Sequence, residues 1–562
     1  MRTNVKVAQF GVHDFVLESS TVHQNPFLVR ISASFEHPSG LHIENVPGFF
    51  DGDGRWVVRF SPLREGLWRG RTSSSDKQLD GLALGPVLCA PKENPAIHGR
   101  VRADAQDRKR FRYEDGTPFV PLGFEWDWLF AYGQVHLGHA PGPKNDNPPL
   151  EEVLNLLTES GFNLIVANLY AHRYHRTELT DATVNYLYGP PPMYVFGGTN
   201  EAPEHWRLNV DFFRSFDQVI AALHRHGLVL HLMIQVQNKA VAWPARNSPQ
   251  DDLFWTYVVA RYQAYSNIIW DVSKESYNLL RHTGSHDYVL GRISLIRRND
   301  AYGHLVTAHD TERESWGGLS QADAACDFIA DQVKLRDPVA LNHEAVRRFR
   351  NTAKPYLNIE YLYEKGVEFL PTVNNDFCRS GLENLISAWA IYAGGGYVTY
   401  YYCNTSWDLI KFRPIPASWR QFRYLRDFLE MADLSGMVPD NDFLLRGMCS
   451  AEPGKRYFLF LPEGGSASLD LSALTPGQAA RCRWLDVLTG QQAETIATER
   501  KFKGSLINPL ADPAHPAAIC VQAVAAPAPA VEASAPASAR EGKAPSIEPA
   551  PVVGTAQYED TA

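Results

Sequence analysis

Two glutamates, Glu275 and Glu360, each close an apolar run of the chain, NIIWDVSKES (267–276) and YLNIEYLYE (356–364). Glycoside hydrolysis needs two carboxyl groups across one bond: a protonated one to assist the leaving oxygen, and an ionised one to attack or stabilise the anomeric carbon. Spacing alone leaves open whether these glutamates are catalytic or pair with basic residues at a domain surface. Glu364, just beyond Glu360, is a rival candidate for the ionised role.

Other apolar runs also end in hydrogen-bonding or aromatic side chains. A ring of such groups matches a sugar, whose hydroxyls need donors and acceptors and whose C–H faces need an aromatic surface. The predicted substrate-binding residues are Glu125, Trp126, Asp127, Asn168, Tyr170, His172, Gln237, Asn238, Lys239, Lys274, His309, Tyr361 and Tyr402. His231 and Cys403 lie inside apolar runs and are predicted to be packing residues instead.

Eight apolar runs alternate with helical patterns between about residues 96 and 435. The predicted strands are 119–128, 162–171, 228–237, 267–276, 304–310, 326–330, 356–364 and 397–404, with helices including 209–226 and 251–265. This order and length predict a (β/α)8 TIM barrel, which carries catalysis at the carboxyl ends of its strands. An open doubly wound sheet is the alternative, but no glycine-rich phosphate loop follows any strand.

The barrel is predicted to be flanked by smaller β domains. Residues 1–95 and 436–523 show short alternating strands separated by turn residues, which is typical of antiparallel sandwiches. Residues 524–562 are rich in Pro, Ala, Ser and Glu and are predicted to be a disordered tail. The long segment 172–206, rich in Tyr, Pro and Gly, is predicted to be a loop that shapes the substrate site.

Composition excludes several classes of partner. A net charge of −9 argues against nucleic acid or an anionic membrane as the main partner, and no run is long enough to span a bilayer. The seven cysteines are far apart and odd in number, which predicts reduced thiols and gives no sign of a metal site. No cofactor is expected. With no signal-peptide pattern at the N-terminus, we expect a cytoplasmic protein; whether it forms a homo-oligomer stays open.

Six segments together resemble a known family. They are GFFDGDGRWVVRFSPLREGLWRGRTSS (48–74), DGTPFVPLGFEWDWLF (115–130), RLNVDFF (207–213), NIIWDVSKES (267–276), RNDAYGHLVTAHD (298–310) and LNIEYLYE (357–364). In this order they resemble the apiosidase-like barrels of clan A, which are related to glycoside hydrolase family 140. In that family an immunoglobulin-like domain precedes the barrel. The similarity spans about residues 10 to 420. It implies that Glu275 is the acid/base and Glu360 the nucleophile of a retaining enzyme, with carboxyl groups ~5–5.5 Å apart.

One residue departs from the pattern that this clan commonly shows. The residue before the acid/base is commonly Asn, which binds the substrate 2-hydroxyl, and here it is Lys274. This lysine is expected either to contact a hydroxyl or uronic carboxylate, or to turn outward and pair with an acid. Its charge would lower the pKa of Glu275 and oppose the acid role, so another group must compensate.

The sequence therefore predicts a retaining glycoside hydrolase that acts from chain ends on plant or microbial oligosaccharides. A polysaccharide lyase acting on uronate-containing glycans is the second hypothesis, because Lys274 could neutralise a uronate. A non-catalytic carbohydrate-binding protein is the third.

Overall fold

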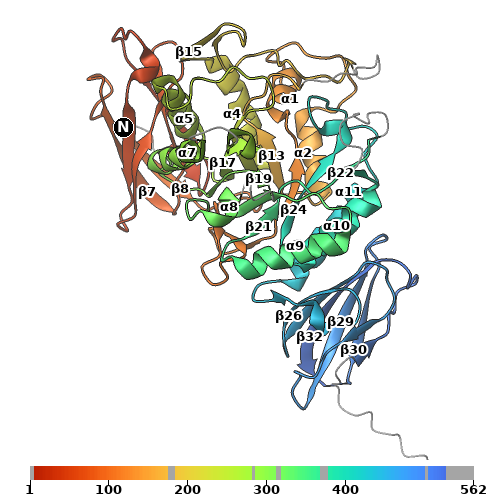
Figure 1. The fold of residues 1–562 in the computed structure, drawn as a ribbon. Coiled ribbons are helices and arrows are strands. Elements are labelled where there is room, and N and C mark those ends of the chain that lie inside the picture. Colours follow the sequence, from red (N-terminus) through yellow and green to blue (C-terminus); the bar gives the residue numbers. More distant parts are fainter. Residues whose placement is uncertain are drawn as a thin grey trace, which may run out of the picture.

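A computed structural model describes residues 5–174, 184–280, 285–311, 318–366, 377–499 and 504–526 (Figure 1). Its central unit is a ring of parallel strands surrounded by helices. Two sheets built from the N-terminal residues lie on one side of this ring, and a C-terminal sheet lies beyond helices α10 and α11 (Figure 1). The predicted tail falls almost entirely outside the described residues, as does part of the segment 172–206.

The ring follows the chain order of a (β/α)8 barrel. Its strands are β12 (Leu122–Glu125), β13 (Leu164–Asn168), β16 (Val229–Val236), β17 (Ile268–Lys274), β18 (Val306–Thr307), β19 (Asp310–Thr311), β20 (Ile329–Gln332), β21 (Tyr356–Asn358) and β24 (Tyr397–Tyr402). Apart from β18 and β19, which do not pair with each other, successive strands pair in parallel, and β24 closes onto β12. Strand β18 pairs with β17 and β19 with β20, so a single strand, broken at Ala308 and His309, completes the ring.

Helices cover the outside of the ring. They are α1 (Leu129–His136), α2 (Leu150–Glu159), α4 (Val210–Arg225), α5 (Pro249–Tyr262), α7 (Ser285–Asn299), α8 (Leu319–Ala322), α9 (Pro338–Asn351), α10 (Gly381–Ala393) and α11 (Ser418–Ala432). Helix α4 shows how the local sequence sets the ends of a helix. The side chain of Asn209 caps its start, and Gly227 takes a left-handed φ of 67° just after its end. Its apolar face, which includes Phe212 and Phe216, is fully buried.

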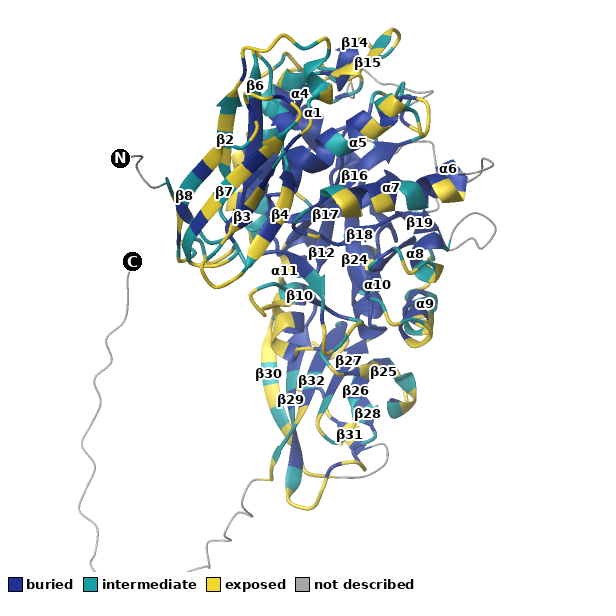
Figure 2. Cartoon of the chain, turned by 90° about the vertical axis from the view of Figure 1, so that its left-hand side faces the viewer, coloured by how far each residue is buried: buried dark blue, intermediate teal, exposed yellow. Residues whose placement is uncertain are grey.

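The strands are continuous apolar runs because both of their faces are covered. All eight residues of β16 are buried, and the ring strands are dark blue almost throughout in Figure 2. The sixth strand lies later than the sequence predicts, at Ile329–Gln332 rather than 326–330. The segment before it forms turns, in which Asp323 accepts a hydrogen bond from the backbone of Ala325.

The N-terminal residues form two sheets packed face to face. One contains β1 (Val5–Ala8), β8 (Ala83–Ala90), β7 (Gly66–Ser74), β3 (Ile31–Glu36) and β4 (His42–Pro47), and the other β2 (His13–Glu18), β6 (Arg55–Phe60) and β5 (Phe49–Phe50). Their shared core includes Phe35, Trp56 and Trp68. The buried Arg59 and Arg261 both bind Asp217 of α4, at 3.1 and 2.6 Å, which ties this unit to the barrel.

The C-terminal residues form a six-stranded sheet and a two-stranded sheet. The larger contains β25 (Val438–Pro439), β26 (Met448–Glu452), β27 (Arg456–Leu461), β32 (Ala517–Ala525), β29 (Gln478–Asp486) and β30 (Gln492–Ala497). Trp389 of α10 stacks on Phe458 and Phe460 of β27, with ring centroids 6.1 and 5.8 Å apart. This aromatic contact holds the sheet against the outside of the barrel.

Candidate active site

A cavity of about 90 Å³ lies at the carboxyl ends of the barrel strands. It is lined by Asp127, Tyr174, Asn238, Lys239, Lys274, Glu275, Lys334, Glu360, Tyr363, Phe377, Cys378, Tyr401, Ser406 and Trp407. Both candidate catalytic glutamates therefore face one small space. Six of the residues singled out in the sequence line it: Asp127, Asn238, Lys239, Lys274, Glu275 and Glu360.

Glu360 follows β21 and is 1% exposed. Its Oε1 forms an ion pair with Lys334 and also accepts a hydrogen bond from the hydroxyl of Tyr363. Its Oε2 has no hydrogen-bond partner among the described residues. Burial alone would raise the pKa of Glu360, but the charges of Lys334 and Lys274 outweigh it and lower the pKa to about 2. Glu360 is thus an ionised carboxylate with one oxygen held and the other free.

Glu275 directly follows β17 and has a φ of +49°. A left-handed backbone at a non-glycine residue costs about 1 kcal/mol or more and persists where neighbours impose it. Two amides hold the side chain: Nδ2 of Asn238 lies 2.5 Å, and Nδ2 of Asn278 3.2 Å, from its Oε2. The backbone turn and these donors fix Glu275 at the cavity wall.

Lys274 points into the barrel, where it pairs with acids. Its Nζ lies 2.8 Å from Oδ1 of Asp127 and 3.1 Å from Oε1 of Glu125, and the lysine is 5% exposed. Burial opposes the charged form of all three groups. The lysine nevertheless lowers the pKa of Asp127 to about 2, whereas burial and the neighbouring Asp127 raise the pKa of Glu125 well above its usual range. The lysine therefore favours the ionised form of Asp127, whereas burial favours the protonated form of Glu125.

Asn168, Lys239 and His309 lie around this group. Nδ2 of Asn168 donates to Oδ1 of Asp127 at 2.9 Å, and Nζ of Lys239 lies 3.8 Å from Oδ2 of the same aspartate. His309 is fully buried, and neither ring nitrogen has a hydrogen-bond partner among the described residues. Burial lowers its pKa, which favours the neutral ring. Asn168 and His309 do not line the cavity.

Three aromatic residues predicted to bind substrate face away from the cavity. Trp126 packs against Tyr132 and Phe412, at ring-centroid distances of 4.9 Å each. The hydroxyl of Tyr361 donates to the backbone oxygen of Asn384 in α10, and that of Tyr402 to Pro414. Side chains alternate along a strand, so a residue directly beside an inward one points outward. The inward residues here are Asp127, Glu360 and Tyr401.

The remaining predictions also lie outside the cavity lining. Tyr170 packs against Phe130 and Phe212, His172 lies 3.7 Å from Glu201, and Gln237 donates to Gln235. Glu364, the rival to Glu360, accepts hydrogen bonds from Tyr400 and Ser418 on the outer side of the ring. His231 is a paired core histidine, 2.6 Å from Asp271, as expected.

Several cavity residues are absent from the sequence predictions. The most important of them is Lys334, which follows β20. The sequence pattern places this strand too early in the chain. The polar residues after the strand could have indicated that Lys334 belongs to the site. The aromatic lining consists of Tyr174, Tyr363, Phe377, Tyr401 and Trp407. The rings of Tyr363 and Trp407 are stacked 5.2 Å apart. These rings, rather than Trp126, supply the apolar surface.

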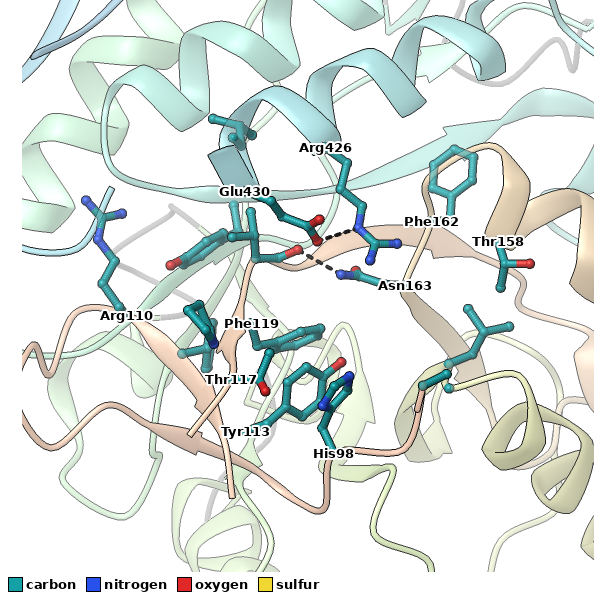
Figure 3. Close-up of a pocket in the computed structure, with 18 of the residues that line it drawn as sticks. His98, Arg110, Tyr113, Thr117, Phe119, Thr158, Phe162, Asn163, Arg426 and Glu430 are labelled. Carbon is teal, nitrogen blue, oxygen red and sulfur yellow. Dashed lines mark hydrogen bonds and ion pairs between the residues drawn. The ribbon is translucent and has the colours of Figure 1, made fainter. Parts of the chain in front are cut away.

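A larger cavity of about 520 Å³ lies at the opposite end of the barrel (Figure 3). Its lining includes Phe119, Asn163 and Leu228, which precede strands, and the ion pair between Arg426 and Glu430 at 2.8 Å. This end of a barrel serves stability rather than catalysis. Within the described ranges, no group of three or more His, Cys, Asp or Glu side chains could hold a metal ion, and no helix is long and apolar enough to cross a membrane.

Comparisons with known proteins agree with this architecture. The family model for the apiosidase-like catalytic domain matches residues 105–436, and a domain of unknown function (DUF5060) matches residues 6–75. No curated protein matches the chain. A Bacteroides vulgatus protein, named provisionally as a glycoside hydrolase, superposes with a TM-score of 0.71 at 20% identity, covering 92% of this chain and 100% of that one.

A second solved structure, a glycoside hydrolase family 5 protein of Bacteroides vulgatus, has a TM-score of 0.56 at 14% identity, covering 76% of this chain and 93% of that one. At such identities the structural likeness establishes the fold alone. The family model covers more than half of the chain, and it describes the segment that forms the barrel and both glutamates. The chain is therefore a glycoside hydrolase that belongs to the apiosidase-like catalytic domain family.

Proposed function

We propose that this enzyme is a retaining glycosidase in which Glu360 is the nucleophile and Glu275 the acid/base. The observation that carries the proposal is the state of Glu360: Lys334 and Tyr363 both hold Oε1, while Oε2 has no described partner. A held, ionised carboxylate with one free oxygen suits attack on an anomeric carbon.

In the proposed first step, Oε2 of Glu360 attacks the anomeric carbon as the glycosidic bond breaks, and Glu275 gives its proton to the leaving oxygen. In the second step, Glu275 takes a proton from water, the water oxygen attacks the same carbon, and the bond to Glu360 breaks. Lys274 does not add an unbalanced charge beside Glu275, because Asp127 neutralises it at 2.8 Å.

We further infer that the enzyme removes single units from chain ends of plant or microbial oligosaccharides. The cavity of about 90 Å³ is small beside the roughly 300–1,000 Å³ of pockets for drug-sized ligands, which favours a site for one sugar unit. The lyase hypothesis has less support, because the lysine that would neutralise a uronate is paired with Glu125 and Asp127.

A screen of aryl glycosides across pentoses, hexoses and uronates tests the proposal, with Glu360→Ala as the paired control. We expect wild-type enzyme to release the aryl group from one sugar class and the variant to release almost none. Near wild-type activity in Glu360→Ala would contradict the mechanism. A product that absorbs in the ultraviolet like an unsaturated uronate would favour the lyase.

A further inference from the structure

Two buried cysteines meet beside the catalytic cavity. Sγ of Cys378 lies 3.4 Å from Sγ of Cys403, and the two residues are 2% and 0% exposed. Cys378 belongs to β23 (Cys378–Arg379), and Cys403 follows β24. All seven cysteines of the chain lie in the described residues, and none of them forms a disulfide. The pair is therefore a reduced dithiol at near-contact distance.

This dithiol is connected to the catalytic groups. Cys378 lines the cavity and pairs in parallel register with Tyr363 of β22 (Tyr363–Glu364), whose hydroxyl donates to Glu360. Cys378, Cys403, Tyr363 and Tyr401 form one buried apolar cluster. A small reagent that enters the cavity thus reaches Cys378 first, and any change at Cys378 acts on the strand that orients Glu360.

The surroundings give the two thiols different reactivity. A thiol hydrogen bond from Cys403 lowers the pKa of Cys378 to about 7, with the positive charges of Lys365, Arg379 and Lys334 adding to the effect against burial. The pKa of Cys403 is raised by the same contact, by burial and by Glu364. The pKa values of the other five cysteines are raised as well, with burial the largest cause. Since the thiolate is the nucleophile, Cys378 is the reactive member of the pair.

We propose that Cys378 and Cys403 form an oxidation site, at which a hydroperoxide closes a disulfide that lowers the hydrolase activity. The thiolate of Cys378 attacks a peroxide oxygen, the O–O bond breaks, and the leaving oxygen takes up a proton to become water or an alcohol. Cys378 becomes a sulfenic acid. The sulfur of Cys403 then attacks that of Cys378, the S–O bond breaks, and water leaves with the thiol proton, so two thiols are oxidised and one peroxide is reduced.

The effect on activity follows from the geometry and rests on the proposed function. A disulfide has an S–S length of about 2.05 Å, so the two sulfurs must approach by about 1.3 Å from their separation of 3.4 Å. Strand β22 lies between β23 and β24 and pairs with both. Drawing its neighbours together moves Tyr363 relative to Glu360, and small displacements of catalytic groups cost large factors in rate.

Mass spectrometry of the full-length enzyme tests the chemistry independently of activity. Reduced enzyme is treated with hydrogen peroxide, remaining thiols are blocked with N-ethylmaleimide, and peptides are mapped. We expect a Cys378–Cys403 crosslink that has lost two hydrogens and that dithiothreitol reverses. Cys520, the more exposed cysteine, should remain a free thiol under the same treatment, because pairing rather than exposure controls the reaction.

The activity arm uses the aryl glycoside that wild-type enzyme cleaves. Peroxide should lower the rate at least ~10-fold, dithiothreitol should restore it, and Cys403→Ala and Cys378→Ala should resist reversible loss, whereas Cys520→Ala should behave like wild type. Melting curves of each variant check that it is folded. Oxidation of Cys520 ahead of Cys378, or a crosslinked enzyme with full activity, would overturn the proposal. If no glycoside is cleaved at all, the mapped crosslink still decides whether the oxidation site exists.

Discussion

The ammonium of Lys274 lies 2.8 Å from Oδ1 of Asp127, so an acid in the turn after the first barrel strand neutralises the cation that precedes Glu275. The side chains of Lys274 and Asp127 are 6% and 3% exposed, and Glu125 lies 3.1 Å from the same ammonium. The positive charge that precedes Glu275 in the chain is thus neutralised within a buried pair. Lys274 therefore pairs with the buried acids Glu125 and Asp127 rather than with a solvent-exposed acid.

Replacing Lys274 by Met should destabilise the barrel by about 3 kcal/mol, because the buried Asp127 would lose the nearer of its two lysines and keep only Lys239, 3.8 Å from its Oδ2. Calorimetric melting of the barrel transition measures this loss. The double variant Lys274→Met/Asp127→Asn should recover part of it, and Lys455→Met, at an exposed lysine of the C-terminal sheet, should change little. A single variant as stable as wild type would mean that the pair contributes nothing.

Glu360→Ala should lower kcat by about 10⁴-fold or more, since the covalent step loses its nucleophile. Azide should partly restore turnover by occupying the space of the missing carboxylate, and the product should be a glycosyl azide of inverted configuration. Rates on the best aryl glycoside and product analysis by NMR provide the measurement. Glu364→Ala is the matched control, because Glu364 is bonded to Tyr400 and Ser418 outside the cavity.

Glu275→Gln should lower kcat by about 10²–10⁴-fold on substrates with poor leaving groups, because the proton donor is lost. The loss should be much smaller for an aryl group that leaves without protonation. A series of aryl glycosides of decreasing leaving-group pKa provides the measurement. An equal loss across that series would show that Glu275 does not protonate the leaving oxygen.

Lys334→Met should shift the acid limb of the pH profile. A carboxylate nucleophile supports activity above its pKa and loses it as pH falls through that value. With Lys334 present the pKa of Glu360 is about 2; without it, burial acts with less opposition and the pKa rises. The acid limb of kcat/KM should therefore move to higher pH in the variant. Lys455→Met should leave that limb in place, and an unshifted limb in Lys334→Met would contradict the assignment.

The barrel order and the position of the two glutamates at strand ends could be predicted from the sequence because both depend on local pattern, whereas the catalytic roles of the glutamates were implied only by the family resemblance. Apolar runs of strand length ended at Glu275 and Glu360, and parallel strands bring their carboxyl ends to one face. The inward and outward faces at strand ends were harder to assign. Trp126, Tyr361 and Tyr402 each sit one residue from an inward side chain, and a shift of one residue reverses the face.

Lys334 and the contacts of Lys274 depend on tertiary structure. Lys334 lies in a polar segment after a short strand, and no spacing rule links it to Glu360. Lys274 was expected to bind substrate or to turn outward and pair with an acid. It lines the cavity and pairs inside the ring with two acids, Glu125 of β12 and Asp127 of the turn after it. The distance between strand one and strand four across a closed ring is not encoded in local periodicity.

In the proposed mechanism Glu360 becomes covalently bonded to the sugar. Incubation with a 2-deoxy-2-fluoro aryl glycoside of the preferred sugar slows the second step, and peptide mapping then locates the trapped sugar. We expect a single sugar on the peptide that contains Glu360, and no label in Glu360→Ala. A label on Glu275 or another carboxylate, or an inverted first-formed product, would contradict it.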